Sequence, residues 1–347
     1  MAIRTPLLAL LLLAACDGNP FPGGAGGGGG GSSGGSSVDL PGTTNPSSSR
    51  SISRHEDLNK GPGGTVTGNG FAEGIKYDAA NDTFTVDNLA FDGGNVYQRD
   101  VGKPTVGPAQ AYAADTTYAD DNTGVLIDQF SYRALYGVSR TGRTNFAIVR
   151  TGAYIPYGFG GFVYNRTGGV VLPKSGQANY SGTYAGLRDF NNVTTAEPKL
   201  EYTTGDMNVA VDFNDFNPSA TNGTGRGVQG FVTNRHIFDL NGNDITGTVV
   251  AEINKDQGLK GAGKLLDLPS LNFTVGPDVL DNNGEAEAGV TSTVPTSTGS
   301  GTTLESGKYY AVISGDNADE LVGVLVVTST VNGTETRETG GFILYRP

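Results

Sequence analysis

Hydrophobic and polar residues alternate along most of the chain after residue 61, and no stretch repeats its apolar residues with a helical period. Alternation with a period of two places apolar side chains on one face of a β-strand. Gly, Asn-Gly and Asp-rich segments interrupt these runs, as turns between short strands do. The pattern therefore predicts an all-β protein.

Two hairpins are the clearest local predictions. Residues 322–330 and 337–345 flank Asn332-Gly333, a dipeptide that favours a tight hairpin turn. Residues 131–139 and 144–152 flank a polar turn in the same way, and a turn at 281–284 leads into a strand at 285–293. Further strands are predicted over 71–77, 83–91, 161–164, 178–187, 207–213, 228–238, 247–253, 270–275 and 308–315.

The strand pattern divides the chain at residues 164–176, where Pro173 and a polar segment interrupt it. Short connections join almost all strands of residues 166–347. We predict that these strands form an eight-stranded up-and-down antiparallel β-barrel, because closure leaves no exposed strand edge. Residues 61–165 contain fewer strands with longer connections, and we expect a small β-sheet region packed on the barrel.

The first residues predict a lipoprotein signal peptide over 1–15. Arg4 supplies a positive charge, and residues 7–15 are an apolar run too short to cross ~30 Å of hydrocarbon. The run ends in Leu-Ala-Ala-Cys16, which resembles the lipobox of bacterial lipoproteins. The resemblance implies that the lipoprotein-export machinery attaches a diacylglycerol to the Cys16 sulfur and a further acyl chain, such as palmitate, to its amine. The alternative is an ordinary cleavage site, but Cys16 is the only cysteine of the chain.

Residues 16–60 are predicted to form a disordered Gly/Ser-rich tether behind the lipidated cysteine. They include a run of six glycines and a serine cluster, which offer almost no apolar surface to bury. Asp17 follows the cysteine directly, and in enteric bacteria an aspartate there retains a lipoprotein in the inner membrane. That rule does not extend to all bacteria, so the effect of Asp17 on sorting stays open.

Composition and charge exclude several classes of protein. One cysteine and two histidines among 347 residues exclude a disulfide scaffold and a Cys/His zinc site, and we expect no cofactor. The formal net charge is −12, and loss of Arg4 with the signal peptide changes it to −13. Such a charge disfavours nucleic acid and anionic lipid as partners. We therefore expect contact with the membrane through the lipid anchor only.

A membrane-spanning barrel is an alternative, because its strands also alternate. Its strands carry aromatic residues at both ends, and the strands predicted here lack that regular pattern. A lipid anchor with a long tether would also be redundant on such a barrel. We therefore favour a barrel that lies outside the membrane.

The sequence offers no catalytic set. Serine hydrolase chemistry needs a histidine beside the nucleophile, and the two histidines are His55, at the edge of the tether, and His236, a surface position of a predicted strand. Carboxylates do not gather at any predicted strand end, as a glycosidase would require. We predict a non-catalytic protein.

Two Asp-rich segments superficially match calcium loops. Asp239, Asn241 and Asn243 have the right spacing, but the sixth and twelfth positions depart from the EF-hand pattern, so we expect a polar turn. Residues 115–122 offer a weak calcium site as an alternative. The N-terminal glycine runs follow no strand and precede no helix, so they are not nucleotide-binding loops.

Four short passages, at residues 176–184, 207–213, 242–247 and 309–323, carry a family resemblance, mostly through Gly, Ala and aromatic residues. The first places Tyr180 and Tyr184 in a Tyr-x-Gly-x-aromatic strand, and the last contains Ala318 and Glu320 before Gly323. Together they resemble the β-barrel domain of the transferrin-binding protein B family of bacterial surface lipoproteins. In that family the passage at 242–247 corresponds to a hairpin that precedes the next barrel strand.

This resemblance implies a fold and a broad role. The expected fold is a single barrel with a flanking sheet, and the expected location is the outer-membrane surface. The chain departs from the family at Val324, where a second glycine is usual, and it has one barrel where the full receptor has two lobes. No residue that contacts transferrin can be carried over, so the ligand-binding residues stay unknown.

The residues of these passages also have roles that follow from strand geometry. Tyr180 and Tyr184 lie on one face of a strand, and we expect them to fill the barrel interior or to cap its end. Gly182, Gly186 and Gly323 lie inside strands, where they permit the tight coiling of a small barrel. Glu320 and Asn317 lie beside a turn, and we expect them to bond backbone amides of loops.

Two functions are favoured after these exclusions, ahead of an enzyme of unrecognised type. The first is a lipid-anchored surface lipoprotein that binds an extracellular protein or solute without catalysis, as in iron or nutrient acquisition. The alternative is a structural or adhesive envelope lipoprotein without a specific soluble ligand, which the acidic, Ser/Thr/Gly-rich composition also fits.

Overall fold

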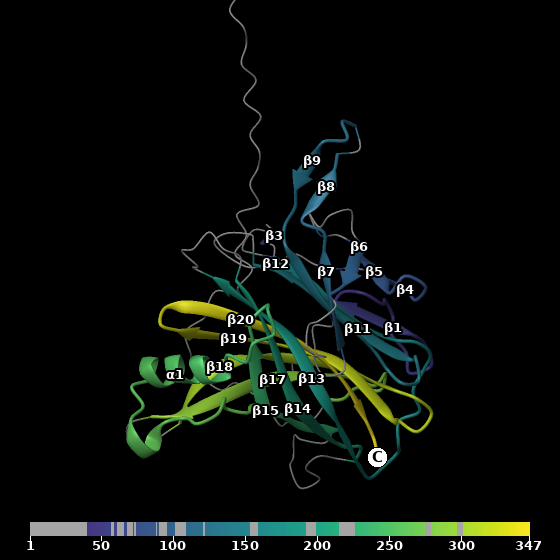
Figure 1. Cartoon of the computed structure of the whole chain (residues 1–347). Helices are drawn as coiled ribbons and strands as arrows, with labels where there is room; N and C mark the ends of the chain where they lie inside the picture. Colours follow the sequence, from purple (N-terminus) through teal and green to yellow (C-terminus); the bar gives the residue numbers. More distant parts are fainter. Residues whose placement is uncertain are drawn as a thin grey trace, which may run out of the picture.

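The structure is a computed structural model, and it describes two β-sheet units that pack on each other (Figure 1). The described residues are 40–56, 59–60, 66–67, 72, 74–87, 89, 96–100, 109–120, 122–152, 159–191, 199–214, 226–274, 279–296 and 301–347. The predicted signal peptide, Cys16, Asp17 and the glycine run lie outside the described residues.

The C-terminal unit is a closed eight-stranded antiparallel barrel, as the sequence predicted. Each strand pairs with its neighbours in chain order, and β13 closes the barrel by pairing with β20. The strands are β13 (Gln177–Asn191), β14 (Leu200–Asp212), β15 (Gly227–Phe238), β16 (Leu271–Phe273), β17 (Glu285–Pro295), β18 (Gly301–Ser314), β19 (Glu320–Val331) and β20 (Thr334–Tyr345).

The predicted Asn332-Gly333 hairpin joins β19 to β20. Val331 pairs with Thr334, and both turn residues have positive φ, 51° for Asn332 and 78° for Gly333. Asparagine and glycine are the residues that adopt this conformation at least cost, which explains why this dipeptide marks the turn.

The N-terminal unit is an eight-stranded antiparallel sheet in the order β1-β12-β11-β10-β7-β6-β5-β4. Its strands are β1 (Ile52–His55), β4 (Ile75–Asp78), β5 (Thr83–Val86), β6 (Val96–Arg99), β7 (Ala109–Ala114), β10 (Tyr132–Val138), β11 (Thr144–Thr151) and β12 (Phe159–Arg166). Two small hairpins accompany it, β2 (Asn59–Lys60) with β3 (Val66–Thr67), and β8 (Thr117–Ala119) with β9 (Leu126–Asp128).

The sheet begins earlier than the sequence predicted. Residues 16–60 were expected to be a tether, but β1 within that range pairs with β12 in antiparallel register. The apolar residues Leu40 and Ile52 are buried in the layer between sheet and barrel. The serine-rich composition around residue 50 concealed these two anchors, so the prediction of disorder as far as residue 60 is wrong for residues 40–56.

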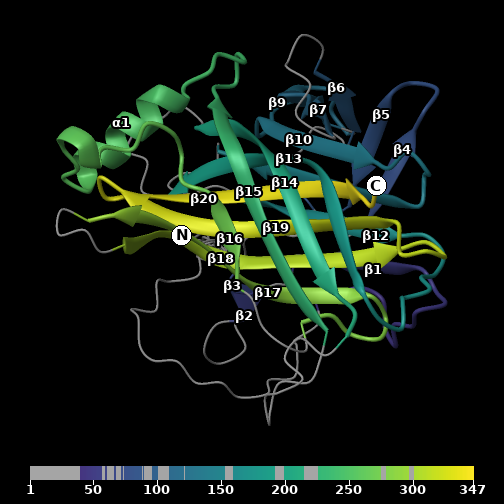
Figure 2. The ribbon, with the colours of Figure 1, turned by 90° about the horizontal axis from the view of Figure 1, so that it is seen from below.

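One face of the N-terminal sheet packs against the outside of the barrel (Figures 1 and 2). The shared apolar layer contains Leu135, Phe146, Ile148, Phe162 and Tyr164 from the sheet, and Ala185, Leu187, Tyr202, Val312, Val322, Val324 and Ile343 from the barrel. Residues 167–176 connect the units, within the range where the sequence predicted a boundary. The division into separate domains stays a prediction.

The predicted strand at 247–253 is wrong, because this segment is the helix α1 (Thr246–Asp256). Its Thr and Val residues have high β-propensity, which explains the error. A turn at Asp244 precedes the helix: its Oδ1 accepts a hydrogen bond from the Thr246 N–H at 2.8 Å, while the N-cap residue Ile245 makes no side-chain capping bond. The helix ends at Gly258, which follows the C-cap Gln257 and has a φ of 65°. In the described part of the chain no helix is long and apolar enough to cross a membrane.

The passage at 242–247 consequently precedes a helix, not the next barrel strand. Strand β16 follows only at Leu271, and it pairs with two residues on each side. The barrel wall is therefore short beside β16. The segment of residues 239–270, which contains α1, covers the end of the barrel at which β15 ends and β18 begins (Figure 2).

Candidate functional site

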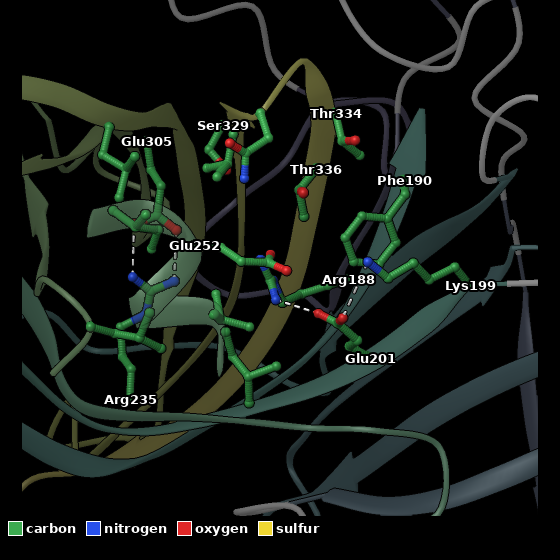
Figure 3. A pocket seen from close by; sticks show the side chains of 17 residues that line it. Arg188, Phe190, Lys199, Glu201, Arg235, Glu252, Glu305, Ser329, Thr334 and Thr336 are labelled. Atoms are coloured by element: carbon green, nitrogen blue, oxygen red, sulfur yellow. Dashed lines mark hydrogen bonds and ion pairs between the residues drawn. The ribbon is translucent and has the colours of Figure 1, made fainter. Parts of the chain in front are cut away.

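A cavity of about 200 Å³ lies inside the barrel at the end covered by α1 (Figure 3). Its lining comes from both the barrel and the helix. The lining residues that carry charge are Arg188, Lys199, Glu201, Arg235, Glu252 and Glu305, and the apolar ones are Phe190, Ile237, Val249, Ile253, Leu268, Leu304 and Val331. Ser329, Asn332, Thr334 and Thr336 complete the lining. The cavity is thus a mixed polar and apolar space.

Arg235 is the most deeply buried cation of the cavity, with a side chain 1% exposed. Its guanidinium donates to both carboxylate oxygens of Glu305, each at 2.8 Å, and to both oxygens of Glu338 at 3.0 and 3.1 Å. Ser292 Oγ donates to Glu305 Oε2 at 2.6 Å. Burial alone would raise the pKa of the Glu305 carboxyl. The Arg235 charge, the hydrogen bonds from Arg235 and Ser292 and the charge of Arg188 together outweigh burial and lower that pKa.

Arg188 forms the second buried ion pair. It donates to Glu201 on the neighbouring strand, and its Nε lies 3.5 Å from Glu338 Oε2. Glu338 also accepts a hydrogen bond from the Tyr184 hydroxyl at 2.9 Å. The Glu338 carboxylate therefore connects both arginines and the tyrosine in one network.

The mouth of the cavity carries two further charges. Lys199 is 48% exposed; its Nζ lies 3.7 Å from Glu201 Oε1 and 4.0 Å from the centre of the Phe190 ring. Glu252 is exposed on α1 and points into the cavity (Figure 3). Among the described residues Glu252 has no ion pair, which sets it apart from the other carboxylates of the cavity.

Strand geometry explains how the charged residues reach the interior. Arg188 lies an even number of positions from Tyr180 and Tyr184 on β13, so its side chain points into the barrel as theirs do. On β15 the register shifts near Asn234, which has a positive φ of 48°. Before this bulge the even-numbered residues of β15, such as Val232, point into the barrel. After it the odd-numbered residues, such as Arg235, do so.

Of the two roles predicted for the barrel tyrosines, the structure shows that they fill the interior. Tyr180 and Tyr184 are fully buried in the barrel core, and the Tyr180 hydroxyl donates to the Ala318 carbonyl. Burial, with the nearby Glu338 charge, raises the pKa of Tyr184 well above its ordinary value. The strand glycines are also explained, since a Cβ atom at Gly182 or Gly186 would lie 2.7–2.8 Å from neighbouring strand atoms.

The predicted partners of Glu320 are wrong. Its carboxylate accepts hydrogen bonds from the hydroxyls of Thr141 and Thr144, at 2.8 and 2.5 Å, and not from loop amides. Both threonines belong to the β10–β11 hairpin, so Glu320 fastens the N-terminal sheet to the barrel. The Asn317 carbonyl accepts a hydrogen bond from Arg346 at 3.4 Å, a local contact near the C-terminus.

Neither histidine lines the cavity. His236 is 43% exposed on β15, as predicted, and its Nδ1 lies 3.1 Å from Asp244 Oδ2. His55 lies on β1, not at the edge of a tether, and its Nδ1 lies 3.0 Å from the carbonyl oxygen of Glu56.

The segment around Asp239 is a polar turn, as predicted. Asp239 Oδ1 accepts hydrogen bonds from the backbone N–H groups of Asn241 and Asn243, and hydrogen bonds from Asn243 lower the pKa of the Asp239 carboxyl. Asp120 Oδ1 accepts hydrogen bonds from the backbone N–H and the hydroxyl of Thr123. Asp121 lies outside the described residues. Within the described ranges no group of three or more His, Cys, Asp or Glu residues is arranged to hold a metal ion.

Comparisons with known proteins give similarity to solved structures only. No protein-family model matches the chain, and no curated protein matches it in sequence. A double mutant of transferrin binding protein B from Haemophilus parasuis Hp5 aligns with a TM-score of 0.34 and 11% identity, over 80% of this chain and 45% of its own. Intact Ap-TbpB, with N and C lobes, aligns with a TM-score of 0.30 and 11% identity, over 86% of this chain and 61% of its own.

A third structure, a protein of unknown function from Nostoc punctiforme, aligns with a TM-score of 0.16 and 9% identity, over 80% of this chain and 88% of its own. The present chain spans less than two thirds of the transferrin binding protein B chains. Similarity at this level assigns neither a family nor a ligand.

Proposed function

We propose that this protein is a lipid-anchored lipoprotein of the outer-membrane surface that binds an extracellular protein or solute without catalysis, in iron or nutrient acquisition. The acyl chains on Cys16 hold it in the membrane, and the Gly/Ser-rich segment after Cys16 separates the barrel from the lipid. The lipobox and the resemblance of the barrel passages to the transferrin-binding protein B family support this proposal.

The observation that carries the binding role is the charged cavity at the α1 end of the barrel. The rest of the barrel interior is closely packed by apolar residues, including Tyr180, Met207 and Phe273. A cavity next to such a core, with arginines and carboxylates held in place by ion pairs, is typical of a preformed site for a polar ligand. The surrounding strand connections then provide the contact surface.

The charge distribution supports an extracellular partner over a membrane surface. The mature chain is strongly acidic, which opposes contact with anionic headgroups. The anchor and the folded units therefore act separately, one in the membrane and the other in the medium.

Capture from growth medium or host fluid tests the binding role. The mature chain, held on immobilised lipid vesicles by the acyl chains of Cys16, is compared with a variant that carries Glu252→Lys and Lys199→Glu at the cavity mouth. Asp316→Lys, at an exposed position of the opposite barrel end, is the matched control. We expect a partner that the wild type and the control retain and the cavity variant loses. Equal capture by all three, or no capture in repeated trials with different fluids, would support a structural or adhesive role instead.

Metabolic labelling with a palmitate analogue tests the anchor. The wild type should incorporate the label, and Cys16→Ser should not, because only the thiolate can accept the diacylglycerol. Label retained in Cys16→Ser would contradict the lipobox assignment.

A further inference from the structure

The size of the cavity limits what it can hold. Its volume is about 200 Å³, which is below the roughly 300–1,000 Å³ of sites for drug-sized ligands. A peptide or a tetrapyrrole exceeds this space, whereas a solute with a short alkyl chain fits it.

Among the described residues, the charges around the cavity do not balance. Arg188, Lys199 and Arg235 supply three positive charges, and the carboxylates of Glu201, Glu252 and Glu305, together with Glu338 beneath them, supply four negative charges. Three of these carboxylates have arginine partners, and Glu252 has no ion pair among the described residues. The unbalanced carboxylate faces the cavity, so the space favours a cation.

The mouth of the cavity already holds one ammonium group. Lys199 Nζ lies over the Phe190 ring at 4.0 Å and beside the Glu201 carboxylate at 3.7 Å. An aromatic face with an adjacent carboxylate is the environment that proteins use to recognise alkylammonium ions. Lys199 is half-exposed on a flexible side chain, so it can move into solvent when another ammonium group takes its place.

An alkyl chain attached to that ammonium group would meet an apolar wall. Val249 and Ile253 on α1 face the cavity, and Leu268 and Leu304 continue the apolar surface. Burial of apolar surface here would add to the charge interaction. An anionic solute would find the opposite situation, because both arginines are already paired with carboxylates and Glu252 would repel it.

We infer that the cavity binds a small primary amine, with its ammonium group between Glu252 and the Phe190–Glu201 pair and its alkyl chain against α1. This inference rests on the proposed function and names the class of solute that its site accepts. The amine is the recognised chemistry, and the alkyl chain is limited to the length that the cavity holds.

Calorimetric titration of the mature chain with n-butylammonium tests the inference, with butyrate as the probe of similar size and opposite charge. We expect saturable binding of n-butylammonium and no binding of butyrate. Glu252→Gln should weaken the affinity by about tenfold, because it removes one charge-assisted contact. Lys199→Met should strengthen it, because it removes the competing ammonium group.

Asp267→Asn is the matched control, since it removes an exposed carboxylate from the same segment, residues 239–270, without lining the cavity. Its affinity should equal that of the wild type. Equal binding of butyrate and n-butylammonium, or an affinity that Glu252→Gln leaves unchanged, would overturn the inference. Failure of amine binding together with successful capture of an extracellular partner would overturn this inference alone and leave the proposed function standing.

Discussion

The ring of Phe146 on β11 lies over Gly341 on β20, in the space that a Cβ atom at residue 341 would occupy. Phe146 belongs to the N-terminal sheet and Gly341 to the outer surface of the barrel. Inside the barrel, the ring of Tyr184 occupies the space that a Cβ atom at the preceding residue, Gly340, would fill. Two consecutive glycines thus admit an aromatic ring on each side of one barrel strand.

Gly341→Ala should destabilise the protein by about 1–3 kcal/mol, because the added methyl group overlaps the Phe146 ring. Denaturant unfolding measures this loss. Gly247→Ala is the control, since a Cβ atom there has no neighbour within 4 Å, and it should be neutral or slightly stabilising in α1. Equal stability of the two variants would contradict the packing described here.

Tyr184→Phe and Tyr309→Phe should differ although each removes one buried hydroxyl. The Tyr184 hydroxyl donates to Glu338, so its removal should cost about 1–3 kcal/mol of unfolding free energy. The Tyr309 hydroxyl is buried without a hydrogen-bond partner among the described residues, so its removal should be neutral or stabilising. Thermal unfolding of both variants tests the pair, and a larger loss for Tyr309→Phe would contradict the network.

Glu285 and Glu287 lie on the same strand but in different surroundings. Glu285 forms two hydrogen bonds with Arg54 of the N-terminal sheet, at 2.6 and 2.7 Å, and both side chains are nearly buried. Glu285→Gln should cost about 3–5 kcal/mol, because it removes the carboxylate charge from a nearly buried ion pair. Glu287→Gln removes a pair with the exposed Lys308 and should cost less than about 1 kcal/mol. Similar unfolding free energies would show that Arg54 does not hold the two units together.

Glu56 gives a pH-dependent contribution at the sheet–barrel interface. It lies between Arg150 and Arg337, and burial raises the pKa of its carboxyl above the ordinary value of 4.5. A group with a raised folded-state pKa stabilises fully below its unfolded pKa, and this stabilisation is lost as the pH rises through the folded pKa. Glu56→Gln should therefore cost more unfolding free energy at pH 4 than at pH 7. Urea unfolding of both proteins at pH 4 and pH 7 tests this. A cost of Glu56→Gln that is larger at pH 7 than at pH 4 would contradict a raised pKa of Glu56.

Strand alternation was sufficient to predict the barrel, because one face of every barrel strand is buried. It failed at residues 247–253, where Thr and Val favour a strand in isolation but Asp244 and Gly258 limit a helix. It also missed β1, because two apolar anchors in a serine-rich segment carry little signal. These errors arise where tertiary contacts outweigh local propensity.

The cavity was harder to predict than the fold. Arg188 follows the inward parity of Tyr180 and Tyr184, so its position could have been read from the strand pattern. Arg235 could not, because a bulge near Asn234 changes the parity of β15. Glu252 was missed as a cavity residue because the sequence predicted a strand, and not a helix, at residues 247–253. The Arg54–Glu285 pair joins residues 231 positions apart, a contact that no local pattern indicates.

Antibody labelling of intact cells tests most directly whether this protein acts as a lipid-anchored surface lipoprotein. We predict that antibodies against the barrel label intact cells that produce the wild type, and that Cys16→Ser abolishes this labelling because the protein loses its anchor. We expect the unfolding transition of purified Cys16→Ser to match that of the wild type, because we propose that the Gly/Ser-rich segment separates the anchor from the barrel. Labelling that appears only after the cells are permeabilised, or labelling that persists in Cys16→Ser, would contradict the account.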